Sequence, residues 1–207
     1  GSPANVAIGL ARLGRDVQLL TWLGEDGNGD LVRDHLESSR VRIASGSQRA
    51  EHTSTASATI AEDGSASYVF DLTIDYPEHR VSDDTVVVHV GSIGAVLEPG
   101  ATKVATLLGS MRHRAVITYD PNLRPSIMGE PDAVRERIAE IVAISDVVKV
   151  SDEDLAWLEP GREPLDVARE WATKGPALVA VTLGSEGSLA VTSGGEHTHV
   201  EAPRVNV

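Results

Sequence analysis

The sequence contains no cysteine among its 207 residues. Disulfide bonds and cysteine-based zinc sites are therefore excluded for this chain. Aromatic residues make up only 3% of it, so Val, Leu, Ile and Ala must fill the core. No apolar run is long enough to span a membrane, and no early segment has the pattern of a secretory signal. These absences predict a soluble, cytoplasmic protein without a membrane partner.

Positive charge is also scarce. The chain has 18 Lys and Arg residues against 31 Asp and Glu residues, and its net charge is −13. A protein field of this sign repels nucleic acid and anionic lipid, so we expect no nucleic-acid partner. The same field opposes a phosphorylated ligand. Any phosphate site must therefore be built locally, from main-chain N–H groups, a few Arg side chains and a metal ion.

What the sequence does have is a core-forming 41% of hydrophobic residues, arranged as apolar strands that alternate with helices. Ser2-Pro3 is typical of a capped helix start. Residues 17–23 indicate a strand, and Asp30 is expected to begin a second helix. Further strands are expected at 86–90, 115–119, 147–150, 177–183, 188–192 and 197–201, with helices at 100–110, 132–144, 152–158 and 164–174. This alternation predicts an α/β fold with a mainly parallel central sheet flanked by helices.

One segment breaks the pattern. Residues 53–61 are rich in Thr, Ser and Ala, Asp63-Gly64 is a turn signal, and residues 65–72 resume as a strand that includes Phe70. We expect a small β hairpin at about 53–72, set apart from the main sheet within a single domain spanning 1–207.

Ligands of parallel sheets bind outside the carboxyl ends of the strands. The polar or glycine-rich segments at these ends are residues 24–29, Gly91-Ser92, 120–124, 151–154 and 182–187. Arg124 suits phosphate through its fork of donors, although 120–125 also fits a structural turn. Gly184 and Gly187 could shape an anion nest or a tight β-turn.

Two further candidates lie at helix starts. Asn5 offers a donor and an acceptor for sugar hydroxyls, but Gly1 to Asn5 also fits an ordinary capped helix. Ser151 precedes an acidic first turn and is best explained as an N-cap. Asp154 could hold magnesium directly or through water. The seven histidines show no zinc spacing, and no Gly-x-Ser-x-Gly motif is present.

The order of these segments is more telling than any one of them. Gly-Ser-Pro-Ala-Asn-Val-Ala, Leu-Gly-Glu-Asp-Gly-Asn-Gly, a small hairpin, Gly-Ser-Ile, Asp-Pro-Asn-Leu-Arg, Lys-Val-Ser-Asp-Glu-Asp-Leu and Thr-Leu-Gly-Ser-Glu-Gly follow one another. The chain thereby resembles the ribokinase-like (PfkB) carbohydrate kinases over nearly its whole length. It looks closest to bacterial fructokinases.

The resemblance implies an ATP- and Mg²⁺-dependent sugar kinase and assigns roles by position. Gly1 and Asn5 match sugar-binding positions, the hairpin with Phe70 matches a lid over the sugar, and Arg124 matches an Arg near the sugar and the transferred phosphate. The ends of the family's Asn-x-x-Glu motif, which organises magnesium and phosphates, fall on Ser151 and Asp154. The nucleotide loop falls on Thr182, Gly184 and Gly187.

The sequence departs from the family in ways that limit this assignment. Ser151 and Asp154 replace the longer or stronger Asn and Glu, which favours metal contact through water over direct contact. The family's first strand, which has an early sugar-binding Asp, would precede Gly1. The Asp-Thr-x-Gly-Ala-Gly-Asp segment, whose last Asp is the catalytic base, would follow Val207. We therefore expect the natural protein to extend at both ends, and residues 1–207 alone to lack phosphoryl transfer.

Several functions remain open on the sequence alone. Fructose is the expected substrate because residues 67–73 of the hairpin contain no Lys or Arg for a substrate carboxylate, although Arg124 or Arg80 could supply one. Ribose and 2-keto-3-deoxygluconate are alternatives, as is a non-catalytic sugar- or nucleotide-binding relative. A dinucleotide oxidoreductase fits worst, because residues 24–29 lack the Gly-x-Gly-x-x-Gly order. The exposed edges of the hairpin further predict a homodimer through paired lids.

Overall fold

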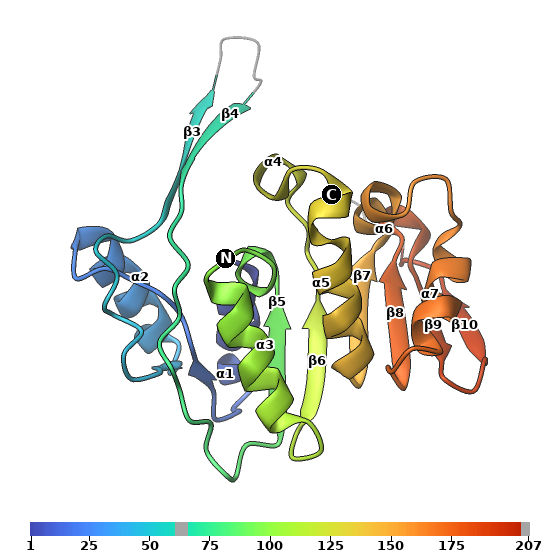
Figure 1. Cartoon of the computed structure of the whole chain (residues 1–207), viewed down its shortest axis with the longest axis horizontal. Helices are drawn as coiled ribbons and strands as arrows, with labels where there is room; N and C mark the ends of the chain where they lie inside the picture. Colours follow the sequence, from blue (N-terminus) through green and yellow to red (C-terminus); the bar gives the residue numbers. More distant parts are fainter. Residues whose placement is uncertain (61–65, 204–207) are drawn as a thin grey trace. The chain divides into compact units, whose positions relative to one another are not determined.

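A computed structural model of the chain describes residues 1–60 and 66–203 (Figure 1). The chain divides into two compact units. The first comprises Gly1–Arg80 and Leu97–Lys103, and the second comprises Val81–Val96 and Val104–Val207. Helix α3 (Gly100–Met111) contributes its first residues to the first unit and the remainder to the second. Within the described residues, every helix is too short or too polar to cross a bilayer.

Two helices and two short parallel strands form the first part of the first unit. They are α1 (Ser2–Arg12), β1 (Gln18–Leu19), α2 (Gly27–Ser38) and β2 (Arg42–Ile43). The expected helices are present, but α1 is preceded by Gly1 and has no side-chain cap, so the prediction that Ser2 caps it was wrong. The strand expected at 17–23 is only two residues long. Its only ladder among the described residues is with β2, and Leu23 instead bonds the loop at Ser47 and Ala50.

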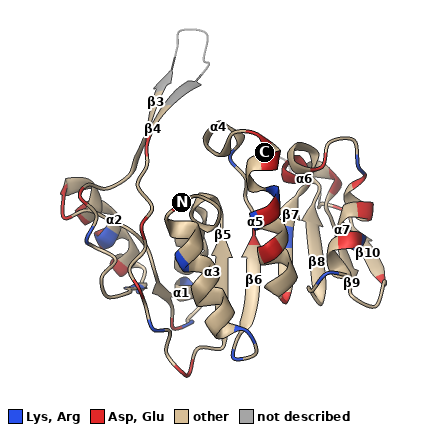
Figure 2. Cartoon of the chain, viewed as in Figure 1, with Lys and Arg blue, Asp and Glu red and all other residues tan. Residues whose placement is uncertain are grey.

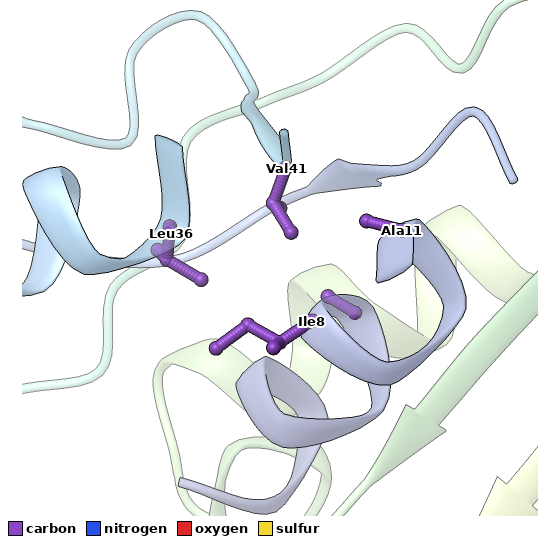
Figure 3. Close-up of a cluster of buried hydrophobic side chains, with 5 residues drawn as sticks. Ile8, Ala11, Leu36 and Val41 are labelled. Carbon is purple, nitrogen blue, oxygen red and sulfur yellow. The ribbon is translucent and has the colours of Figure 1, made fainter. Parts of the chain in front are cut away.

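The C-terminus of α2 is built into the core of this unit. Ala7, Ile8, Ala11, Leu36 and Val41 form one buried cluster, and Figure 3 shows Leu36 and Val41 directed toward Ile8 and Ala11 of α1. Val41 N–H donates to the Leu36 carbonyl at 3.1 Å, and Arg40 N–H donates to the Glu37 carbonyl at 2.8 Å. This pair of bonds, with contact between the residues that flank it, is a Schellman motif. Glycine usually occupies the left-handed position of this motif, but here Arg40 does so, with φ 65°.

The glycine-rich segment 24–29 has a structural function that its sequence did not reveal. Asp26 caps α2 by accepting the Gly29 N–H at 2.8 Å, and it also accepts the Thr53 N–H at 2.7 Å. The helix therefore begins at Gly27 rather than at the expected Asp30. A Cβ on Gly29 would overlap the main-chain oxygen of Gly24. The glycines here allow backbone segments to pack against each other, and these hydrogen bonds lower the pKa of Asp26.

The expected hairpin is present. Strand β3 (Thr55–Ile60) pairs antiparallel with β4 (Ala66–Asp71) in a two-stranded sheet of its own. Its base is fastened by Ser54 Oγ, which donates to the Thr73 carbonyl at 3.0 Å and accepts the Thr73 N–H at 2.9 Å. The Asp63-Gly64 turn signal lies outside the described residues. The lid function assigned to the hairpin stays a prediction.

A six-stranded sheet in the order β10-β9-β8-β7-β6-β5 forms the second unit. Its strands are β5 (Val87–Gly91), β6 (Val116–Asp120), β7 (Val147–Ser151), β8 (Leu178–Thr182), β9 (Ser188–Thr192) and β10 (His197–Val200). Strands β5 to β8 are parallel, and β9 and β10 extend the sheet beyond β8 by antiparallel pairing. The mainly parallel sheet flanked by helices is thus confirmed.

The helices of this unit are α4 (Pro125–Met128), α5 (Pro131–Ile144), α6 (Asp152–Leu158) and α7 (Pro164–Ala172), together with single turns at Ile93–Ala95 and Gly184–Glu186. In Figure 1, α5 and α7 lie across the front of the sheet. Side chains alternate between the two faces of a strand. One set is fully buried, namely Ile117, Tyr119, Val148, Val150, Val179, Val181 and Val191. Val and Ile form most of this set, and the buried residues of the chain are mainly Val, Ile, Ala and Leu, as the scarcity of aromatics predicted.

Charged residues are concentrated on the helices of the second unit, while β8, β9 and β10 contain none (Figure 2). Glu159, at the end of α6, accepts Arg135 of α5 at 2.6 Å. Glu170 of α7 accepts Arg162 at 2.7 Å and Lys174 at 2.5 Å. The first pair links α5 to the end of α6, and the other two lie around α7; at the surface each contributes little by itself.

We expect Arg40→Gly to stabilise the full-length protein by up to about 1 kcal/mol, because a side chain in the left-handed region costs roughly 1–2 kcal/mol and glycine regains only part of that loss as chain entropy in the unfolded state. Urea denaturation measures the change. Arg40→Ala is the matched control, since it removes the guanidinium but keeps the Cβ. Its free energy of unfolding should stay near that of the wild type. If Arg40→Ala raised the free energy of unfolding as much as Arg40→Gly does, the guanidinium and not the backbone would be the source of strain.

We expect Asp26→Asn to lower the denaturation midpoint at pH 7, because an amide nitrogen would face a main-chain N–H. The folded-state pKa of Asp26 is lowered, so the stabilisation is present above the unfolded pKa and is lost as the pH falls through the folded value. The difference in denaturation midpoint between the wild type and Asp26→Asn should therefore become smaller below about pH 4. Asp30→Asn, in the first turn of the same helix, should lower the denaturation midpoint at pH 7 by less than Asp26→Asn does. A difference that does not change with pH would contradict this account.

Candidate active site at the carboxyl ends of the parallel strands

Four parallel strands end at the same edge of the sheet in the second unit. In the register, Gly91 of β5 lies opposite Asp120 of β6, and Ser151 of β7 lies opposite Thr182 of β8. A Cβ on Gly91 would overlap the main-chain oxygen of Asp120, so this close approach requires glycine. The segments that follow these strands are therefore brought to one edge, as the sequence predicted.

The segment that follows β6 is held by hydrogen bonds from both of its neighbours. Ser92 N–H, after β5, donates to the carbonyls of Asp120 at 3.2 Å and Pro121 at 3.0 Å. On the other side, Leu123 N–H donates to the Asp154 carboxylate of α6 at 2.9 Å. The guanidinium of Arg124 is exposed and donates to Asn122 Oδ1 at 3.0 Å. An exposed guanidinium on a fixed segment can receive an anion.

The start of α6 combines capping with a candidate metal position. Ser151 Oγ accepts the Asp154 N–H at 3.0 Å, which confirms that Ser151 is an N-cap. Its hydroxyl can still donate while it accepts. One carboxylate oxygen of Asp154 is engaged by Leu123 N–H. Within residues 1–60 and 66–203 there is no cluster of three potential metal ligands. A single carboxylate nevertheless fits Mg²⁺, which keeps several waters and takes phosphate oxygens as further ligands.

Polar side chains on the sheet itself surround Asp120, and of these Lys149, His89 and Thr118 escaped the sequence reasoning. Lys149 Nζ of β7 lies 3.5 Å from Asp120 Oδ2, while Asp120 Oδ1 is buried without a hydrogen-bond partner. On β5, His89 Nδ1 lies 2.9 Å from Thr118 Oγ1. Burial lowers the pKa of His89, and the charge of Asp120 partly opposes this shift. Lys149 precedes Ser151 by two residues, so strand alternation could have identified it as facing the same side.

The two glycines after β8 have different surroundings. A Cβ on Gly187 would overlap the main chain at Val200 and Ala202, and Gly187 also has φ 100°. This glycine is needed for packing, whatever else it does. Gly184 has φ 55°, and a Cβ there would meet open space. Leu183 N–H donates to the Gly187 carbonyl at 2.8 Å, which closes the segment as a tight turn. Among the predicted nucleotide positions, Gly184 therefore borders open space, whereas Thr182 is half-buried at the end of β8.

The remaining predicted site residues belong to the first unit. Gly1 and Asn5 are exposed at the start of α1, where Asn5 N–H donates to the Gly1 carbonyl at 3.2 Å. Phe70 is half-buried on β4, opposite Ala56. The structure therefore gathers Arg124, Ser151, Asp154, Thr182 and the two glycines in one unit. Sugar contacts of Gly1, Asn5 and Phe70 stay predictions.

Comparison with known proteins agrees with this geometry. The profile of the pfkB family carbohydrate kinases matches residues 1–207. The chain is 31% identical to a fructokinase from Rhizobium leguminosarum bv. trifolii over 216 aligned residues, which cover all of the chain and 65% of the relative.

Two solved structures are similar over nearly all of the chain. The apo fructokinase of Vibrio cholerae O395 superposes with a TM-score of 0.83 at 25% identity, covering 97% of this chain and 72% of that one. A sugar kinase from Pyrococcus horikoshii in complex with ATP superposes with a TM-score of 0.80 at 25% identity, covering 100% of this chain and 68% of that one.

The chain thus spans 65% of the length of the Rhizobium relative and 52% of a probable chloroplastic fructokinase from Arabidopsis thaliana. The match of the family profile nevertheless extends over the whole chain, from Gly1 to Val207. The order of motifs and the parallel sheet with polar strand ends point the same way. The chain belongs to the pfkB family of carbohydrate kinases.

Proposed function

We propose that the full-length protein is a cytoplasmic sugar kinase that transfers the γ-phosphoryl group of ATP to a hydroxyl of a small neutral sugar, with fructose as the first candidate. The observation that carries the proposal is the coupling of two strand-end segments. Leu123, which precedes Arg124, donates its N–H to the Asp154 carboxylate at 2.9 Å. This bond keeps a cation that suits phosphate close to a carboxylate that suits magnesium. Fructokinases at 31% and 30% identity support fructose, and the ATP complex of the Pyrococcus relative supports the nucleotide.

In the proposed reaction, several described residues bind the phosphates or the nucleotide. Arg124 binds the transferred phosphoryl group, since its fork of donors suits phosphate oxygens. Lys149 adds a second cation at the strand ends, which offsets the repulsion between a protein of net charge −13 and ATP. Thr182 and Gly184 border the nucleotide, and Ser151 can donate its hydroxyl to a phosphate oxygen.

The metal and the base complete the proposal. Asp154 would hold magnesium through water, and magnesium, when bound, neutralises charge on the phosphates. A sugar hydroxyl also needs a carboxylate to accept its proton. The family resemblance assigns that base to an Asp in a segment that would follow Val207, and this assignment remains a prediction. The sugar itself would be bound by Gly1, Asn5 and Phe70, with the hairpin acting as its lid.

We propose in addition that two hairpins pair to make a homodimer. The side chains of a β strand alternate between faces, so Ala56, Ala58 and Phe70 share the more apolar face of the described hairpin residues. Ala56 and Ala58 are exposed in the single chain. A two-stranded sheet with an exposed apolar face is marginally stable unless it packs against something.

The activity is tested by measuring ATP consumption by the full-length protein with fructose, ribose and 2-keto-3-deoxygluconate. We expect fructose to have the highest kcat/KM. Arg124→Ala should lower kcat at least about 100-fold, as expected for the loss of a group that stabilises developing charge. Arg169→Ala, which removes an exposed guanidinium on α7, is the matched control and should retain activity. Much faster turnover of the keto acid would exclude a neutral sugar. Binding of ATP without turnover of any sugar would indicate a non-catalytic relative.

The assembly is tested by light scattering at micromolar concentration. We expect a mass of two chains for the wild type and of one chain for Ala58→Glu, because a buried carboxylate on the shared face would lack a partner. Leu31→Glu alters a residue that is 70% exposed on α2 and should leave the dimer intact. A wild-type mass of one chain would refute the proposal.

A further inference from the structure

Ser92 has a backbone conformation that side chains rarely adopt. It follows Gly91 at the end of β5, with φ 61° and ψ −163°. This region of backbone space is occupied almost only by glycine, because a Cβ is crowded there. A serine at this position persists only if the surrounding structure holds it. The sequence offered Gly91-Ser92 as a strand-end candidate, and no role in the proposed reaction has yet been assigned to this serine.

The contacts of Ser92 explain what holds it. Its N–H is shared between the carbonyls of Asp120 at 3.2 Å and Pro121 at 3.0 Å. Its hydroxyl donates to the carbonyl of Asn122 at 3.3 Å. Ser92 also precedes the single helical turn Ile93–Ala95, where a serine commonly caps the helix with its own side chain. Here the hydroxyl makes no such cap. The side chain is directed across to the next strand-end segment instead.

The segment that receives these bonds is itself strained and held from the far side. Asn122 has φ 40°, in the left-handed region. Leu123 N–H is bound by the Asp154 carboxylate at 2.9 Å. Between these two attachments, Asn122 Oδ1 accepts the Arg124 guanidinium at 3.0 Å, and the Leu123 carbonyl accepts it at 2.6 Å. The groups that orient the guanidinium are therefore fixed by Ser92 on one side and by Asp154 on the other.

We propose that Ser92 is a positioning residue for Arg124. Its hydroxyl and N–H hold residues 120–122 in the conformation that directs Asn122 toward the guanidinium, which donates to the Asn122 carbonyl at 3.4 Å and to Asn122 Oδ1 at 3.0 Å. The guanidinium is thereby presented to a phosphate in a restricted set of orientations, which reduces the entropy lost on binding. The catalytic part of this inference rests on the proposed kinase function, but the positioning itself does not.

Two substitutions separate the hydroxyl from the backbone. Ser92→Gly removes the hydroxyl, keeps the main-chain N–H and suits the observed φ and ψ. Ser92→Ala removes the hydroxyl but keeps the crowded Cβ. Ser145→Ala is the matched control, because Ser145 Oγ likewise donates to a main-chain carbonyl, that of Ile141 at 2.7 Å, at the end of α5. Thermal denaturation should show Ser92→Gly to be as stable as the wild type or more so.

The kinetic test uses the full-length protein with ATP and the best sugar. We expect Ser92→Gly to lower kcat by roughly 3- to 10-fold, the range for one lost hydrogen bond, with little change in the KM for ATP. In an Arg124→Ala background, Ser92→Gly should cause no further loss, because the residue it positions is gone. Ser145→Ala should leave kcat unchanged. A purely structural role would instead give equal effects of Ser92→Gly in both backgrounds, or unchanged kcat, and either result overturns the proposal.

A second measurement does not depend on activity. Nitrogen-15 relaxation of arginine side chains, with the Arg124 signal assigned by its loss in Arg124→Ala, reports the order of the guanidinium directly. We expect Arg124 to be ordered in the wild type and in Ser145→Ala, and mobile in Ser92→Gly. Unchanged order in Ser92→Gly overturns the proposal, whatever the kinetics. Loss of order in a protein without sugar-kinase turnover would uphold the positioning role and refute the proposed function.

Discussion

Parallel pairing of β5, β6, β7 and β8 is the constraint on which the candidate site depends. Parallel strands place their carboxyl ends at one edge of the sheet, and the loops that follow must satisfy their own main-chain polar groups there. In this protein, Gly91 and Asp120 approach so closely that only a glycine fits opposite the Asp120 carbonyl. The next residue, Ser92, can then donate its N–H to the adjoining segment. The contacts around Arg124 follow from that approach.

The same edge shows why an acidic protein can still accommodate phosphate. Its net charge of −13 disfavours an anionic ligand at long range. At short range, however, Arg124 is exposed and Lys149 lies beside a half-buried carboxylate. Several acidic residues of the neighbouring helices are engaged by cations, for example Glu159 by Arg135 and Glu170 by Arg162. Local geometry therefore outweighs overall charge, since exposed charges are screened within about 10 Å.

Glycines and acidic residues in family motifs turn out to have separable functions. In the first unit, Asp26 binds two main-chain N–H groups, and Gly29 permits the backbone to pass close to Gly24. In the second unit, Gly187 is demanded by the end of β10, while Gly184 borders open space. Some residues of a motif that resembles a ligand-binding loop therefore serve to pack one main-chain segment against another. Only the members that leave space or exposed donors are available to a ligand.

Sequence patterns alone predicted the fold class, the hairpin, most of the strands and the family, because alternation of apolar residues and the order of short motifs are local or linear properties. The sequence also identified Arg124, Ser151 and Asp154 as candidates. It missed Lys149, although strand alternation could have identified it, and it named Ser92 only as part of a strand-end segment without a role. It also placed the start of α2 at Asp30 rather than Gly27. The start of α2 and the role of Ser92 depend on contacts between residues far apart in the chain, namely Asp26 with Thr53 and Ser92 with Asn122. A lone serine or aspartate carries no signal of which distant main-chain group it will bind, so only the tertiary structure could decide that Asp26 is a cap and that Ser92 holds the segment before Arg124.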